Sequence, residues 1–166
     1  MSITGLENPA TPEELERILR SAAFRTLAVV RTPYWRVFLN RDQRYLGRCY
    51  AWYLGGHADL QNAIDLPSAA SKEFWERIAP KFSRGVTRIW GATHVNYAYL
   101  GNETHIHRGH AHWHLIPRYF NGTPKFFDTD FGDQRIGRNY TPREPLILPE
   151  AKLIEIRDVL RSMYGP

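Results

Sequence analysis

Three histidines alternate with apolar residues in the run His110-Ala111-His112-Trp113-His114. Successive side chains of an extended strand point to opposite faces of its sheet, so the three imidazoles would line one face. A neutral imidazole can attack phosphorus, relay a proton or bind a metal ion near neutral pH, because its unperturbed pKa is about 6.5. The spacing therefore predicts a convergent imidazole site, with nucleophilic chemistry and metal binding as its candidate uses.

The residues around this run carry a resemblance to a known family. The run continues as Leu115-Ile116-Pro117-Arg118, which completes the pattern His-apolar-His-apolar-His-apolar-apolar. This pattern closely resembles the signature of the histidine triad superfamily of nucleotide hydrolases and transferases. The order of elements is similar too, and the segment 131–140 resembles one that follows the triad in some microbial members. The resemblance covers about residues 35–140 and implies an α+β fold: a central antiparallel sheet with the histidines on one face and helices packed on the other.

The resemblance also implies a role for each histidine. His112 matches the nucleophile, which would attack an α-phosphate and form a covalent nucleotidyl-histidine that water or another acceptor resolves. His110 matches the residue that holds the second ring nitrogen of the nucleophile as a donor. His114 matches the residue that contacts the phosphate and helps the leaving group depart. Diadenosine polyphosphates are the first implied substrates and nucleoside phosphoramidates the second. No metal is implied for the covalent step, magnesium is a candidate companion of a polyphosphate, and a homodimer is expected as in many members.

Four further residues are candidate nucleotide contacts by the same resemblance. Asn40 matches a ribose contact, and Phe38, two residues earlier on the same strand face, would line the base pocket. Asn102 matches a polar residue that contacts the phosphates, and His107 stands where many members place a serine or threonine that does so. Each also has a structural explanation: Asn40 and Asn102 suit turns, Phe38 suits a strand core, and His107 suits an exposed loop.

Two arginines beside the predicted site carry separate expectations. Many members have Gly-His in the turn after the ribose-contacting strand, where that histidine supports the triad, whereas this chain has Gly47-Arg48. Arg48 would bring positive charge to a phosphate or be solvated, and we expect the solvated position. Arg118, which directly follows the proline after the triad, would be a rim charge or a phosphate contact, and we expect it at the rim of the site.

Hydrophobic patterns predict the elements that must position the triad. Alternating or continuous apolar runs predict strands over 27–30, 35–40, 49–54 and 95–100. The last of these should pair antiparallel with the triad strand across a connection of nine residues. A helix start at Thr11-Pro12 predicts a first helix to about residue 20. Helical spacing predicts a helix over 71–90, which Pro80 should kink or divide, and a last helix over about 149–163. The stretch 121–145 is rich in loop residues.

Composition bounds the class of protein. The 166 residues suit one domain, with a core over about 24–140 and a helix on each side, and 43% hydrophobic residues suit a packed globule. No apolar run reaches the length of a membrane span, the N-terminus has no signal-peptide pattern, and the one cysteine, Cys49, is expected as a buried thiol. These features favour the cytoplasm. A net charge of +5 favours an anionic partner such as a phosphorylated molecule.

Two rival functions stay open on the sequence. One is a zinc-dependent hydrolase, because alternating histidines can bind zinc and His105 and His107 add candidate ligands upstream. A convincing partner carboxylate at ligand spacing is absent from the sequence, so no metal ligand is assigned. The other rival is a non-catalytic nucleotide- or RNA-binding module, which the basic charge and abundant tyrosine and tryptophan would suit. Those aromatics fall mostly at core positions, and the arginines look scattered along the chain, so nucleic acid is not the expected partner.

Overall fold

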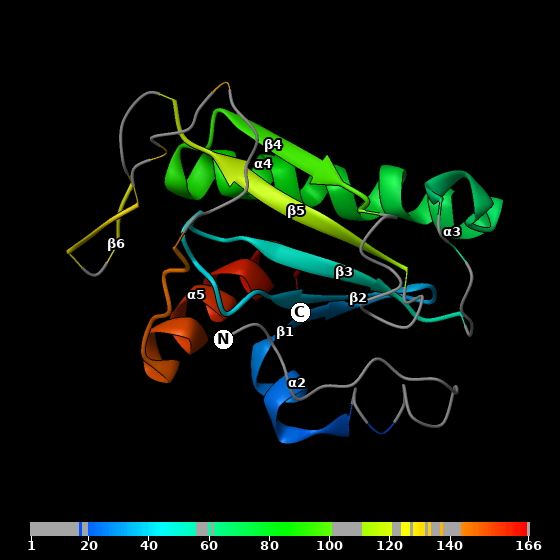
Figure 1. The fold of residues 1–166 in the computed structure, drawn as a ribbon, viewed down its shortest axis with the longest axis horizontal. Helices are drawn as coiled ribbons and strands as arrows, with labels where there is room; N and C mark the ends of the chain where they lie inside the picture. Colours follow the sequence, from blue (N-terminus) through cyan, green and yellow to red (C-terminus); the bar gives the residue numbers. More distant parts are fainter. Residues whose placement is uncertain are drawn as a thin grey trace.

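A five-stranded antiparallel sheet forms the centre of the computed structural model (Figure 1). The structure describes residues 17, 20–55, 60, 62–100, 111–120, 124–126, 128–131, 133, 137 and 144–165. The strand order in space is β1-β2-β3-β5-β4, and every neighbouring pair is antiparallel. The strands are β1 (Ala28–Arg31), β2 (Trp35–Leu39), β3 (Cys49–Tyr53), β4 (His94–Ala98) and β5 (His112–Arg118).

Helices complete the α+β architecture that the sequence predicts. Helices α3, α4 and α5 pack on one face of the sheet, and the short helix α2 lies beside its β1 edge (Figure 1). The bounds are α2 (Ala22–Leu27), α3 (Ser68–Glu73), α4 (Ala79–Trp90) and α5 (Glu150–Ser162), with a short 3-10 turn at Ala63–Asp65. A helix over residues 11–20 stays a prediction, because that segment lies almost wholly outside the described residues.

The interruption expected at Pro80 takes the form of a π-helical turn. Phe74–Ile78 form this turn between α3 and α4, and Pro80 lies in the first turn of α4. A proline cannot donate to the carbonyl four residues earlier and its ring clashes with that carbonyl, whereas the wider π-helical turn has a different hydrogen-bond register. The predicted 71–90 helix is therefore two α-helices joined through a π-helical turn.

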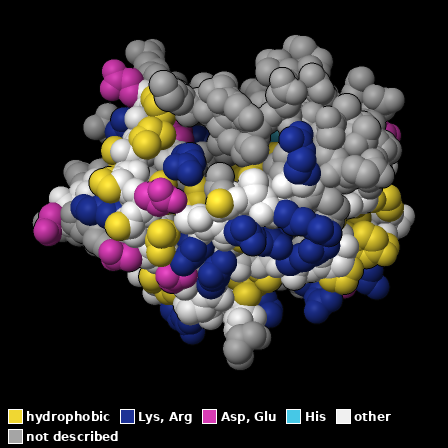
Figure 2. All heavy atoms as spheres, turned by 90° about the horizontal axis from the view of Figure 1, so that it is seen from below, with side chains coloured by type: hydrophobic (Ala, Val, Ile, Leu, Met, Phe, Trp, Pro, Cys, Tyr) yellow, Lys and Arg dark blue, Asp and Glu magenta, His cyan; other side chains and the backbone are white. Residues whose placement is uncertain are grey.

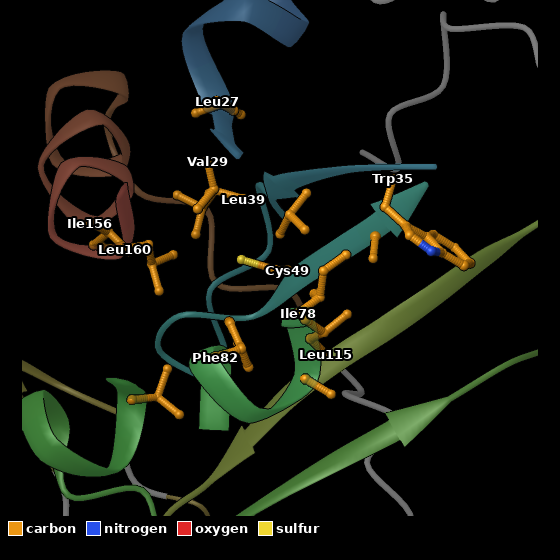
Figure 3. Packing of buried hydrophobic residues seen from close by; sticks show 14 of the residues in the cluster. Leu27, Val29, Trp35, Leu39, Cys49, Ile78, Phe82, Leu115, Ile156 and Leu160 are labelled. Carbon is orange, nitrogen blue, oxygen red and sulfur yellow. The ribbon is translucent and has the colours of Figure 1, made fainter. Parts of the chain in front are cut away.

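The main core lies between the sheet and the helices. Side chains from α4, α5 and the strands interdigitate there, and Cys49 is fully buried among them (Figure 3). Burial raises the pKa of the Cys49 thiol, so this cysteine is the inert core residue that its apolar surroundings predict. On α5, three residues of the expected apolar stripe are buried: Leu153, Ile156 and Leu160.

The one strand pairing that the sequence predicts agrees with the structure. The pairing of β4 with β5 is antiparallel, with Tyr97 opposite Leu115, as the economical connection predicts. The connection itself lies outside the described residues.

Within the loop-rich stretch after β5 the chain forms a small antiparallel ribbon, β6 (Lys125–Phe126) with β7 (Thr129–Asp130). Two-residue strands are too short to produce a hydrophobic period, which explains why the sequence did not reveal this ribbon.

Candidate active site

Two histidines of the triad share one face of β5. His112 and His114 are 7% and 4% exposed, and their ring centroids lie 4.9 Å apart. Trp113, between them, points to the helix face and stacks on Phe74 with a ring separation of 5.1 Å. Because the large Trp113 side chain packs against the helices, the strand has one orientation in the sheet, and both imidazoles point to the opposite face. His110, the third member, lies outside the described residues.

Tyr50 on the neighbouring strand packs edge-on against both histidines. It is the register partner of His114, and its ring centroid lies 4.8 Å from that of His114 and 5.6 Å from that of His112. Tyr50 is not among the site residues that the sequence predicts. The signal was available, because Tyr50 and Trp52 alternate along β3 and share the face of their partners on β5, His114 and His112.

Arg48 is buried against this site, which corrects the expectation that it is solvated. It is 7% exposed, and its Nη1 donates to Asp42 Oδ2 at 2.8 Å. Its guanidinium carbon lies 5.9 Å from the centroid of the Tyr50 ring, within range of a cation–π interaction. The half-buried Asp42 carboxylate stabilises the buried guanidinium, and a pairing across this turn has no periodic signal by which the sequence could predict it. The position that matches the supporting histidine therefore carries a buried cation.

The turn between β2 and β3 is built to hold Arg48 in place. Gln43 is fully buried; its Nε2 donates to the carbonyl oxygens of Asn40 at 2.6 Å and Arg48 at 3.1 Å, and its Oε1 accepts from the Gly47 amide at 2.8 Å. Gly47 has φ +80°, and a Cβ there would lie 2.5 Å from the ring of Trp90. Only glycine suits both the backbone angle and the close approach. The turn is therefore a rigid support and not a mobile loop tip.

The candidate ribose contact, Asn40, takes part in the same turn. It is 4% exposed, and its Oδ1 accepts from the backbone amide of Asp42 at 2.8 Å. This bond forms the Asx turn that was the structural alternative for this residue. A contact between Asn40 and a ribose stays a prediction.

Phe38, the candidate base contact, lies in a small aromatic cluster on the histidine face. It is 2% exposed, and its ring centroid lies 4.8 Å from that of Phe24 on α2 and 5.2 Å from that of Trp52. Phe24 also packs on Trp52 at 5.0 Å. These rings fill the face between β2 and β3, so a base would reach Phe38 only after the cluster opens.

Arg118 is not at the rim of the site, which corrects a second expectation. It is 3% exposed, and its Nε and Nη2 donate to the two carboxylate oxygens of Asp133 at 2.5 and 3.1 Å. Its guanidinium carbon also lies 5.2 Å from the centroid of the Tyr45 ring. The bidentate pair ties the end of β5 to the segment after β7. Asp133 comes from a loop-rich stretch without hydrophobic periodicity, so the sequence could not reveal this partner.

This buried pair leads to a stability prediction. Asp133→Asn removes the carboxylate charge from the buried pair with Arg118 and should lower the free energy of unfolding by about 3–5 kcal/mol in urea titrations. Asp158→Asn is the matched control, because Asp158 pairs with Arg157 at 2.7 Å but is 54% exposed. That exposed pair should contribute less than about 1 kcal/mol. Equal losses for the two variants would contradict the structural role assigned to Asp133.

The remaining predicted site residues lie outside the described residues. They are Asn102, His105, His107 and His110. Within the described ranges, no group of three or more histidine, cysteine, aspartate or glutamate side chains is arranged to hold a metal ion. No helix in those ranges has both the length and the apolar character of a membrane span.

Comparisons with known proteins establish the fold. No protein-family model and no curated protein matches the sequence. Solved structures do match, and three illustrate the likeness. A histidine triad protein from Bradyrhizobium japonicum has a TM-score of 0.62 at 18% identity, over 87% of this chain and 96% of that one. The Plasmodium falciparum diadenosine triphosphate hydrolase has a TM-score of 0.56 at 17% identity, over 83% and 76%.

The third structure is a zinc-bound histidine triad family protein from Mycobacterium smegmatis, with a TM-score of 0.53 at 15% identity and 83% coverage of both chains. At these identities the likeness concerns the fold alone. It confirms the fold that the triad motif implied, a central antiparallel sheet with His112 and His114 on one strand.

Proposed function

We propose that this chain, which has the histidine triad fold, is a nucleotide hydrolase or transferase with His112 as its nucleophile. The observation that supports the proposal best is the pair of buried imidazoles on β5, whose ring centroids lie 4.9 Å apart. Both sit on one face of a sheet, and helices α3, α4 and α5 pack on the other. Two imidazoles at this separation suit one group that attacks phosphorus and a second that handles the leaving group.

The reaction follows from the chemistry of imidazole. A ring nitrogen of His112 would form a bond to the α-phosphorus, and the bond from phosphorus to the bridging oxygen or nitrogen would break. The leaving group would depart with that electron pair, and His114 would supply or position a proton for it. Water or another acceptor would then displace the histidine and release the nucleotide. His110, by resemblance, would hold His112 in the required tautomer.

Dinucleoside polyphosphates are the substrates to test first, with nucleoside phosphoramidates second. The fold is shared with a diadenosine triphosphate hydrolase. Arg48 adds a reason from this chain itself. Its buried cation lies over the ring of Tyr50, and that ring packs against both histidines. A cation in this position would favour a leaving group that departs as a phosphate anion over one that departs as an amine. A homodimer and a cytoplasmic location stay predictions, as do contacts of Asn40, Phe38, Asn102 and His107 with the nucleotide.

The direct test is turnover of labelled diadenosine tetraphosphate by the full chain. We expect a nucleoside monophosphate product and, after rapid quenching under alkaline conditions, an acid-labile label attached to the protein. The rival function, a zinc-dependent hydrolase, is tested by measuring turnover of a phosphoramidate substrate in the presence of a strong chelator. The specific reason to test it is the likeness to a zinc-bound protein. Unchanged turnover with a phosphoramidate substrate after chelation would support the metal-free covalent step. Loss of turnover that zinc restores, or no turnover of any nucleotide, would contradict the proposal.

A further inference from the structure

Tyr50 lies at the centre of the sheet face that carries the two histidines. It is the register partner of Phe38 on β2 and of His114 on β5. Its ring centroid lies 4.8 Å from that of His114, 5.6 Å from that of His112 and 5.4 Å from that of Phe38. The guanidinium carbon of Arg48 lies 5.9 Å from the same centroid. One ring therefore contacts both imidazoles, a buried cation and the candidate base contact.

The contacts of Tyr50 with the two imidazoles have the same geometry. The ring planes are nearly perpendicular, at 81° for His112 and 69° for His114. Aromatic pairs prefer such edge-to-face contacts at these separations, because the positive edge of one ring meets the negative face of the other. A ring that makes this contact with two neighbours restricts the tilt of each imidazole and, with it, their orientation relative to each other.

The position of an imidazole on a strand does not fix the direction in which its nitrogens point. The outer torsion of histidine has a broad, roughly two-fold preference, so a half-turn of the ring exchanges the places of nitrogen and carbon atoms. Attack requires a ring nitrogen aimed at the phosphorus from about 3–3.5 Å. The register of β5 sets where His112 and His114 lie, and the packing around them must set where their nitrogens point.

Tyr50 is itself held from two sides. The Phe38 ring on β2 packs against it with an interplanar angle of 46°. Arg48, two residues earlier in the chain, lies over the Tyr50 ring and is fixed by the bond from its Nη1 to Asp42 Oδ2 at 2.8 Å. These contacts restrict movement of the ring away from the imidazoles. A side chain that is fixed in this way can in turn fix its neighbours.

Charge on the surface of the molecule does not supply this order. In Figure 2 the lysine and arginine side chains gather across the middle and right of the view, whereas acidic side chains concentrate at the left. Such a broad distribution of charge raises the rate of encounter with an anion. It does not align a phosphorus atom with a ring nitrogen, so the alignment depends on side chains within the site.

We propose that Tyr50 is a positioning residue, whose ring holds the imidazoles of His112 and His114 in the mutual orientation that their two chemical steps require. The proposal rests on the proposed function for the steps themselves, which are attack on phosphorus and departure of the leaving group. The ring and not the hydroxyl has this role, because the contacts with both imidazoles are ring contacts. Tyr50 acts through the histidines and takes no part in bond making.

The kinetic test is the single-turnover rate at which labelled diadenosine tetraphosphate forms an adduct with the full chain. Tyr50→Leu should lower this rate on the order of 100-fold, because a misplacement of about 1 Å can cost that much. The dissociation constant of the substrate should change much less, since binding does not depend on the direction of the imidazole nitrogens. Tyr50→Phe keeps the ring and should retain the wild-type rate within about threefold.

The matched control is Tyr53→Leu, which removes the same type of ring from the opposite face of β3. Tyr53 packs on Trp35 at 5.6 Å, in the core between sheet and helices. Its replacement should leave the adduct rate near that of the wild type. Thermal unfolding shows which variants are folded, and Tyr50→Met, with a flexible side chain that fills space, replaces Tyr50→Leu if the leucine variant is unstable.

A second measurement does not depend on turnover. Nitrogen NMR spectra of the imidazoles, assigned with His112→Asn and His114→Asn, report the orientation and exchange of each ring. We expect one set of sharp signals for each histidine in the wild type, in Tyr50→Phe and in Tyr53→Leu. In Tyr50→Leu the signals should broaden or double, because the rings exchange between orientations.

The outcomes separate this proposal from the catalytic one. Sharp, single imidazole signals in Tyr50→Leu would overturn the positioning role, as would an adduct rate that this substitution leaves unchanged. Equal slowing by Tyr50→Phe and Tyr50→Leu would overturn it in favour of the hydroxyl. If the wild type forms no adduct with any nucleotide but Tyr50→Leu still disorders both imidazoles, the proposed function fails while the orienting role of Tyr50 is supported.

Discussion

His112→Asn is expected to lower kcat for diadenosine tetraphosphate by about 10⁴-fold or more, because loss of a covalent nucleophile removes the reaction path and not merely a contact. The dissociation constant of the substrate should stay within a few-fold of the wild-type value, since affinity depends on the pocket and phosphate contacts. His112 is 7% exposed and packs against the edge of Tyr50, so the smaller polar asparagine should leave the sheet intact. Equilibrium binding and single-turnover kinetics measure the two effects separately.

His94→Asn and His114→Asn are the informative comparisons. His94 is an exposed histidine at the β4 edge that contacts Thr93, so its replacement should leave turnover unchanged. His114→Asn should slow a substrate with a poor leaving group more than one whose leaving group departs without protonation. Turnover by His112→Asn within tenfold of wild type, or a protein-bound nucleotide trapped on that variant, would exclude His112 as the nucleophile.

The parts of the fold that sequence could predict are those with a local physical cause. Alternation along β5 places His112 and His114 on one face because a strand has a two-residue period, and the structure confirms this. The disturbance at Pro80 follows from a missing donor and a ring clash, although its resolution as a π-helical turn depends on packing of the whole helix. These features need no knowledge of distant partners.

The parts that sequence could not predict depend on partners brought in by the fold. Arg118 is buried because Asp133 returns to meet it, and Arg48 is buried because Asp42 does. From sequence alone every arginine is expected to be exposed, because burial of its charge requires a specific counter-charge that the sequence does not identify. The wrong predictions for Arg48 and Arg118 therefore have one cause: ion pairs between loop residues produce no periodic pattern in the sequence.

Arg48→Gln is expected to change which substrate the protein prefers. We expect kcat/KM for diadenosine tetraphosphate to fall by about 10- to 100-fold, the equivalent of one charge-assisted interaction of about 1.5–3 kcal/mol. The same variant should hydrolyse a nucleoside phosphoramidate with kcat/KM within about threefold of wild type, because an amine leaving group gains nothing from a nearby cation. The ratio of the two kcat/KM values is the measurement, since it cancels any general loss of folded protein.

Arg44→Gln is the matched control, because Arg44 belongs to the same turn but donates outward to the carbonyl of Glu144 at 3.0 Å. Its replacement should leave the ratio unchanged. Arg48→Lys keeps a charge but loses the planar fork that pairs with Asp42, so it should recover the preference only in part. An equal loss with both substrates in Arg48→Gln would reduce Arg48 to a structural support of Tyr50. A selective loss would mean that the buried cation of Arg48, at the position that the triad resemblance matches to a histidine, sets the leaving-group preference of this site.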